Sequence, residues 1–127
     1  MATIQKSFEQ IQTDGVMNGS TAFGASQDSN LVDLSLYEGV HFQITADNQA
    51  GSPVDSLDIK VFATLDDGVT YDLNPFIYFN IPNAPDPNII SLVVEGYRGI
   101  KIQGVRVGTT DTYKVTLKYR RWNYVSV

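Results

Sequence analysis

The feature that most constrains the fold of this chain is a strict alternation of apolar and polar residues. Every second residue is apolar from Val40 to Asp47, and the same pattern runs from Leu57 to Leu65. Successive side chains of a β-strand point to opposite faces, so the pattern predicts strands with one buried face. No apolar stripe with the period of an amphipathic helix continues beyond about two turns. We therefore expect an all-β protein.

Turn-forming residues separate these segments. Asp67-Gly68 supplies the positive φ angles of a tight hairpin turn, so strands are expected on both sides of it. Prolines before and after residues 76–81 remove backbone donors and predict a short strand or a sheet edge there. Further strands are expected over residues 89–94, 100–107 and 112–122. A β-bulge at Gln103-Gly104 would bring Val105 and Val107 back to the core side.

The N-terminal part of the chain shows weaker strand signals. A first strand is expected within residues 3–11 and another within residues 31–37, whereas residues 12–30 are rich in Gly, Ser, Asn and Asp. We predict that residues 1–127 form one domain, with residues 1–30 as an extended N-terminal arm or a long loop. The expected fold is an antiparallel β-sandwich of about eight strands, and a jelly roll is one arrangement that fits.

Composition excludes several functions. The 127 residues contain no cysteine and a single histidine, His41, which rules out disulfides, thiolate nucleophiles and multi-histidine zinc sites. The sequence pI near 4.6 disfavours general nucleic-acid binding. Residues 1–6 lack the apolar core of a signal peptide, and no apolar run approaches about eighteen residues. We expect synthesis in the cytoplasm, with no membrane partner and no nucleic-acid partner.

Charge is sorted along the chain. Residues 1–97 contain thirteen acidic and two basic residues, whereas residues 98–127 contain seven basic residues and one acid, Asp111. If residues 100–107 pair with residues 112–122, their outward positions form one basic patch. It would contain Lys101, Arg106, Lys114, Lys118 and Arg120. Like charges on facing strands are unfavourable by several tenths of a kcal/mol per pair, so such a patch favours an acidic binding partner. The alternative is compensation within the chain by acids such as Asp58.

Other candidate sites are weaker. Asp66, Asp67 and Asp72 lie near one turn, but their spacing does not match a calcium loop, and aspartate favours turns on backbone grounds alone. His41 is interpreted as an ordinary surface residue. We assign no catalytic, metal-binding or cofactor-binding residue, and we expect no cofactor and no enzymatic activity.

Three segments together resemble a known family. Residues 57–72, residues 99–105 and residues 113–119 are similar to small β-sandwich capsid decoration (cement) proteins of tailed bacteriophages. The resemblance implies a virion structural protein on the capsid surface that binds the major capsid protein and bridges shell subunits. It also implies a homo-oligomer, for which a trimer is plausible. It carries no catalytic residues.

A second function remains open at this point. The hairpin around Asp67-Gly68 is also at home in carbohydrate-binding sandwiches. A carbohydrate-binding or tail-associated adhesion module would use Phe62, Tyr71, Tyr97 or Trp122 to stack on sugar rings.

Overall fold

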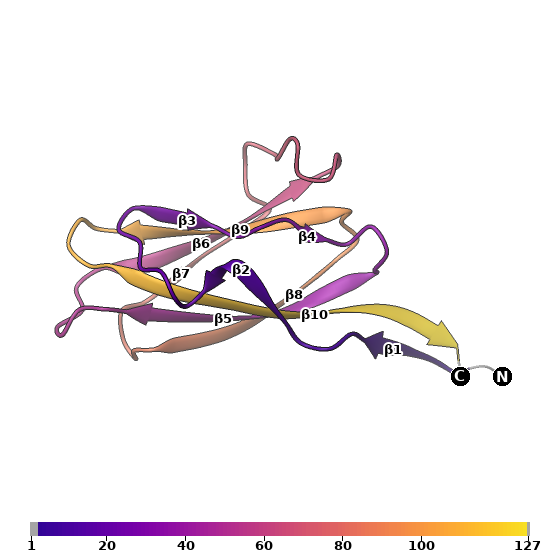
Figure 1. The fold of residues 1–127 in the computed structure, drawn as a ribbon, viewed down its shortest axis with the longest axis horizontal. Coiled ribbons are helices and arrows are strands. Elements are labelled where there is room, and N and C mark those ends of the chain that lie inside the picture. Colours follow the sequence, from indigo (N-terminus) through magenta and orange to yellow (C-terminus); the bar gives the residue numbers. More distant parts are fainter. Residues whose placement is uncertain (1–2, 127) are drawn as a thin grey trace.

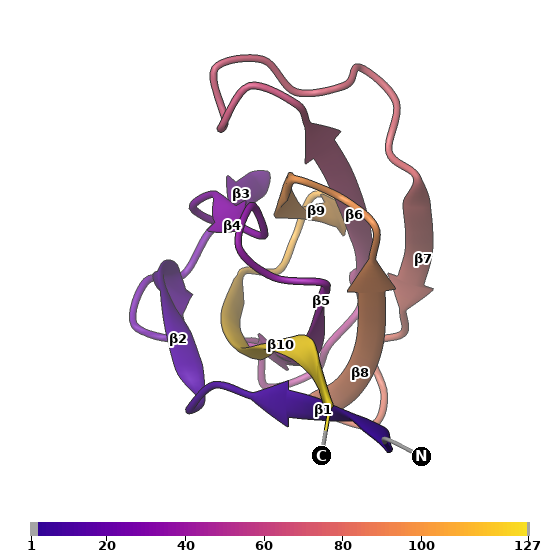
Figure 2. The ribbon, with the colours of Figure 1, turned by 90° about the vertical axis from the view of Figure 1, so that its right-hand side faces the viewer.

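Two five-stranded antiparallel sheets pack face to face in a computed structural model, which describes residues 3–126 (Figures 1 and 2). Sheet A contains β1 (Ile4–Phe8), β2 (Gln12–Asn18), β5 (Gly39–Asn48), β8 (Asn88–Glu95) and β10 (Tyr113–Ser126). Sheet B contains β3 (Ser26–Asp28), β4 (Val32–Asp33), β6 (Ser56–Thr64), β7 (Ile77–Ile81) and β9 (Gly99–Val107). The predicted antiparallel sandwich is confirmed, with ten strands rather than about eight, and the strand orders do not establish a jelly roll.

The core lies between the sheets and follows the alternation of the sequence. Val40, Phe42 and Ile44 of β5 are completely buried, and the two residues between them are exposed. Strand β6 contributes Leu57 and Ile59 in the same way. The alternating strands therefore pack their apolar faces on one another, as aligned sandwiches do.

Strands β9 and β10 are consecutive in the chain but belong to different sheets, so the predicted pairing between them is wrong. Sheet A has the order β1-β10-β5-β8, with β2 also on β10, and sheet B has the order β3-β9-β6-β7, with β4 also on β9. The chain crosses from one sheet to the other after Val107 (Figure 1). Alternation is satisfied equally well by a hairpin and by a crossover, so it did not distinguish them.

The β-bulge predicted in β9 is absent. Residues 99–107 pair with β6 in a continuous register, without a shift. Gly104 therefore faces the core, where a Cβ atom would lie 3.2 Å from Cζ of Phe23. Val105 is half-buried and Val107 is exposed on the outer side of sheet B. Arg106 consequently points to the inner side of its strand, and not outward as expected.

Residues 12–30, expected as a long loop or arm, contribute β2 and β3 to the sheets. Met17 is completely buried, and Phe23, at 9% exposure, also belongs to the hydrophobic core. The polar composition of this segment conceals its strands because few of its side chains point inward.

The turn at Asp67-Gly68 has the predicted positive φ angles, 59° and 90°. The hairpin around it is wider than expected, because β6 pairs with β7 and residues 65–76 form a loop between them. Strand β7 is the predicted edge strand. Residues 3–126 contain no helix of the length and apolarity that crossing a membrane requires.

Candidate functional site: the outer face of β10

The structure divides the five predicted partner-binding residues between the two sheets. Lys101 and Arg106 lie on β9 in sheet B, and Lys114, Lys118 and Arg120 lie on β10 in sheet A. The single basic patch of the sequence prediction is therefore not formed. The two groups also differ in how their charges are compensated.

Lys101 is neutralised within the chain. Its Nζ atom lies 2.9 Å from Oδ2 of Asp28 on the adjacent strand β3. The ammonium also lies 4.6 Å from the ring centroid of Tyr71 and 5.5 Å from that of Phe62. This lysine therefore has a carboxylate and two aromatic rings as partners.

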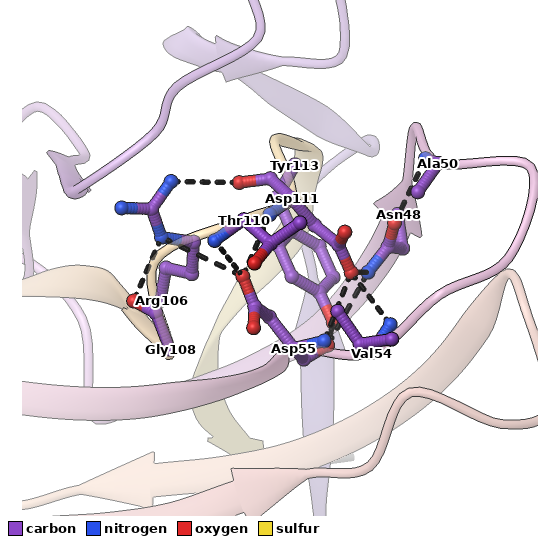
Figure 3. A network of polar contacts seen from close by, with 9 residues as sticks. All are labelled: Asn48, Ala50, Val54, Asp55, Arg106, Gly108, Thr110, Asp111 and Tyr113. Carbon is purple, nitrogen blue, oxygen red and sulfur yellow. Dashed lines mark hydrogen bonds and ion pairs between the residues drawn. The ribbon is translucent and has the colours of Figure 1, made fainter.

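Arg106 joins a network of polar contacts at one end of the sandwich (Figure 3). Its Nη1 donates to the backbone oxygen of Asp111 at 2.8 Å and its Nε to that of Gly108 at 3.1 Å. The Asp55 carboxylate lies 3.9 Å from Nε. The side chain is thus used to hold the crossover between β9 and β10.

The centre of this network is a pair of buried aspartates, which we call the carboxylate clamp. Asp55 Oδ2 accepts the backbone N–H groups of Thr110 and Asp111 at 2.7 and 2.6 Å. Asp111 Oδ2 accepts those of Val54 and Asp55 at 2.8 and 2.9 Å, and the Asn48 amide at 2.9 Å. The two loops that carry these aspartates are therefore joined reciprocally.

The carboxylate clamp explains why a glycine occupies position 108. Gly108 has a φ of +121°, and a Cβ atom there would lie only 1.9 Å from Oδ1 of Asp55, so this position requires glycine. The pKa of Asp111 lies below its ordinary value of 3.8, because hydrogen bonds to its carboxylate favour the charged form. In decreasing order of effect, the donors are the backbone of Asp55, the Asn48 amide and the backbone of Val54. The residues Asp55 and Asp111 are 6% and 4% exposed. Their geometry stabilises the crossover.

The remaining cations form a different kind of surface. Lys114, Lys118 and Arg120 occupy alternate outward positions of β10, and we call them the β10 basic face. Lys114 and Lys118 make no hydrogen bond or ion pair with any carboxylate of residues 3–126, and neither does Arg120. Asp47 is directly opposite Lys114 in the register but forms no ion pair with it. This face is the one group of predicted binding residues that stays uncompensated in the described part of the chain.

A surface hollow of about 140 Å³ opens beside two of these cations. The residues that line this β10 hollow come from β5, β10 and the segment between β1 and β2, and they are Ile11, His41, Gln43, Lys118, Tyr119 and Arg120. In the register, Gln43 is opposite Lys118 and His41 is opposite Arg120. The hollow therefore combines two positive charges, an amide and an imidazole with one exposed aliphatic side chain, Ile11.

One cation of the hollow is held in a defined position. Nε of Arg120 donates to the backbone oxygen of Glu9 at 2.8 Å, and its guanidinium lies 5.3 Å from the ring centroid of Phe8. The Glu9 carboxylate is already bound to the neighbouring Arg121, at 2.6 Å from Nε. Arg120 is thus positioned by a backbone carbonyl and a ring, and it forms no ion pair within residues 3–126.

The contact between Glu9 and Arg121 changes the pKa of the Glu9 carboxyl. Burial of the Glu9 carboxyl raises its pKa. Hydrogen bonds from the side chain and backbone of Arg121 lower this pKa, as do the positive charges of Arg121 and Arg120, and together they outweigh the effect of burial. The pKa of Glu9 therefore lies below its ordinary value of 4.5.

Aliphatic side chains continue the outer face of sheet A beyond the hollow. On β8, Val93 is opposite His41 and Ile89 is opposite Thr45, and these two aliphatic residues are 57% and 56% exposed. The outer face of sheet A therefore combines exposed aliphatic side chains with cations that form no ion pair within the described residues.

Sequence reasoning missed four residues of the hollow, which are Ile11, His41, Gln43 and Tyr119. The alternation of residues 40–47 correctly placed His41 and Gln43 outward, but their neighbours depend on the pairing of β5 with β10. That pairing joins segments far apart in the sequence, so no local signal pointed to it.

The four aromatic residues considered for sugar stacking make contacts within the chain. Phe62 and Tyr71 lie against Lys101, and Tyr97 stacks on Phe76 with ring centroids 4.1 Å apart. Trp122 is 1% exposed beneath Phe8 and Lys6. Trp122 therefore offers no exposed ring face to a sugar.

Within residues 3–126, no group of three or more His, Cys, Asp or Glu side chains is arranged to hold a metal ion. In comparisons with known proteins, no family model matches the chain, and a search of curated proteins found no match. What the structure itself identifies is a small all-β protein of two packed antiparallel sheets.

Proposed function

We propose that this chain is a non-catalytic structural protein of a virus particle, of the capsid decoration kind. In this proposal the outer face of sheet A binds a neighbouring protein of the particle, either the major capsid protein or another copy of the chain. The observation that carries the proposal is the β10 basic face, whose three cations have no carboxylate partner in residues 3–126.

Two further features support a structural role. The resemblance to capsid decoration proteins spans strands of both sheets, and Val93 and Ile89 extend the basic face with exposed apolar surface. A contact of modest strength is sufficient in such a role, because repetition over a lattice gives strong retention through effective concentration.

The proposal is tested by cosedimentation of the purified protein with undecorated shells of the same virus. Binding is expected at low salt and should weaken as salt screens the charges. Lys118→Glu should weaken binding at least tenfold. Lys60→Glu is the matched control, because Lys60 lies on β6 in the other sheet and has no ion pair in the described part of the chain.

Two results would contradict the proposal. One is a wild-type protein that does not sediment with shells even at low salt. The other is an equal loss of binding in Lys118→Glu and Lys60→Glu, which would reflect net charge and not this face.

Carbohydrate binding is a second candidate, favoured by one observation on sheet B. Tyr78 is 58% exposed, and its hydroxyl donates to the Asp58 carboxylate, which also accepts the Asn80 amide at 2.9 Å. An exposed ring beside a carboxylate and an amide is a suitable surface for a sugar. Glycan-array binding that is lost in Tyr78→Ala and kept in Lys118→Glu would favour this function over attachment to a shell.

A further inference from the structure

The loop of residues 65–76 carries the most exposed aliphatic side chains of the described chain. Leu65, Val69 and Leu73 are 87%, 86% and 95% exposed. The loop projects beyond the end of β6, on the side of the molecule away from β5 and β10 (Figures 1 and 2). Such a concentration of apolar side chains in solvent indicates a binding surface.

Hydrogen bonds hold the base of this loop in one shape. The Thr64 hydroxyl accepts the backbone N–H of Gly68 at 3.1 Å, and Asp66 Oδ1 accepts that of Thr70 at 2.7 Å. Asp67 forms a two-point ion pair with Arg98, with distances of 3.0 and 3.2 Å. A loop that is already ordered loses little conformational entropy on binding.

One acid of the loop is left without a partner. The side chains of Asp66 and Asp67 are engaged as described, whereas that of Asp72 makes no hydrogen bond or ion pair with residues 3–126. Leu73, almost fully exposed, follows it directly. The loop therefore presents a free carboxylate beside a free aliphatic side chain.

The β10 hollow has the complementary chemistry. Lys118 and Arg120 supply positive charge and form no ion pair within residues 3–126, and Ile11 supplies an exposed aliphatic surface. Its volume of about 140 Å³ is similar to that of a cavity known to accept a small hydrocarbon ring, about 150 Å³. It therefore has room for a leucine side chain, and the cations at its wall can meet a carboxylate.

A chain cannot place this loop in its own hollow. The loop follows β6 of sheet B, and the hollow lies on the outer face of sheet A, so the whole sandwich separates them (Figure 1). We propose that the loop of one copy docks in the β10 hollow of a second copy, with Leu73 against Ile11 and Asp72 against Lys118 and Arg120. This inference rests on the proposed function, because it names the partner of the same binding face.

The contact is head to tail, since a different surface of each copy takes part. Repetition of a heterologous contact builds a ring where the rotation closes and an open filament where it does not. Either product would bring several copies together as a repeating unit of a larger particle.

The test uses two variants that each break one half of the contact. Asp72→Lys damages the loop and leaves the hollow intact, whereas Lys118→Glu damages the hollow and leaves the loop intact. In analytical ultracentrifugation, the mass of the wild type should rise with concentration. Each variant alone should associate at least tenfold more weakly.

Mixing the two variants is the decisive step. The intact loop of Lys118→Glu should enter the intact hollow of Asp72→Lys, and the two introduced charges are also of opposite sign, so the mixture should regain the association that each variant alone lacks. Glu38→Lys and Lys60→Glu reverse charges elsewhere on the surface and should associate like the wild type. A wild type that stays monomeric at every concentration would overturn the inference, and so would a mixture that stays monomeric.

The same variants separate this inference from the proposed function. If shells bind the wild type and not Lys118→Glu, while no copy binds another in solution, the inference fails and the proposed function stands. If copies associate as described but ignore shells, the inference stands and attachment to a shell fails.

Discussion

The crossover between β9 and β10 and the outer face of β10 both contain basic residues, but these residues have different partners in the two regions. Around the carboxylate clamp, Arg106 is held by Asp55 and two backbone oxygens. On the outer face of β10, Lys114 and Lys118 have no carboxylate partner among residues 3–126. Compensated charge stabilises the fold, and uncompensated charge is available for binding, so the spatial neighbours of a cation decide its role.

The largest effect is expected from breaking the clamp. Asp55→Ala would leave the buried N–H group of Asp111 and the part-buried N–H group of Thr110 without their acceptor, and Arg106 without its counter-charge. Unsatisfied buried donors cost about 1–3 kcal/mol each, so we expect a loss of about 2–4 kcal/mol in the free energy of unfolding.

Chemical denaturation measures this loss, with Asp47→Ala as the control. Asp47 lies on the outer face of sheet A and makes no hydrogen bond through its carboxylate within the described residues, so its removal should change stability by less than about 0.5 kcal/mol. Equal effects of the two substitutions would show that the clamp is not what holds the crossover.

A smaller effect is expected from acid. The pKa values of Glu9 and Asp111 are lowered in the folded protein from ordinary values of 4.5 and 3.8. A lowered pKa contributes stability that is present above the unfolded-state pKa and is lost as pH falls through the folded-state pKa. Thermal unfolding at a series of pH values should therefore show a constant contribution at neutral pH and a decline below about pH 4.5.

The loss of stability in acid should depend on the carboxyl groups of Glu9 and Asp111. Glu9→Gln removes one of the carboxyl groups whose pKa is lowered in the folded protein, so the decline should become shallower in this variant and begin at lower pH. A decline of unchanged steepness would show that other carboxyl groups dominate the acid response.

The smallest effect on stability is expected on the β10 basic face. Lys118→Gln should leave the free energy of unfolding unchanged within about 0.5 kcal/mol, because no carboxylate partner within residues 3–126 is lost. Lys101→Gln loses its contact with Asp28 and should cost about 0.2–1 kcal/mol. Chemical denaturation of both variants compares them, and a larger loss in Lys118→Gln would contradict the distinction between the two groups of cations.

Local pattern was sufficient to predict much of the fold. The alternation in β5 and β6 predicted which side chains are buried, and the prolines around β7 predicted its place at a sheet edge. Asp67 and Gly68 predicted the positive φ angles of the turn. Each of these features depends on a few adjacent residues, which is why the sequence reveals it.

The candidate site was predicted only in part, for a different physical reason. Lys118 and Arg120 were correctly expected to face outward together, but Lys101 and Arg106 were placed on the same patch through a pairing that does not occur. Their real partners, Asp28 and Asp55, are far away along the chain. No local pattern indicates such contacts.

By itself, the sequence determined that the chain forms strands, which faces of most strands are apolar, and where several turns fall. These properties follow from backbone conformational preferences and from a side-chain period of two residues. Only the tertiary structure decided that β9 and β10 lie in different sheets. This arrangement also decided which cations lie beside a carboxylate and which do not. Several non-local strand pairings would bury the same apolar faces, so the alternation alone does not determine which pairing forms.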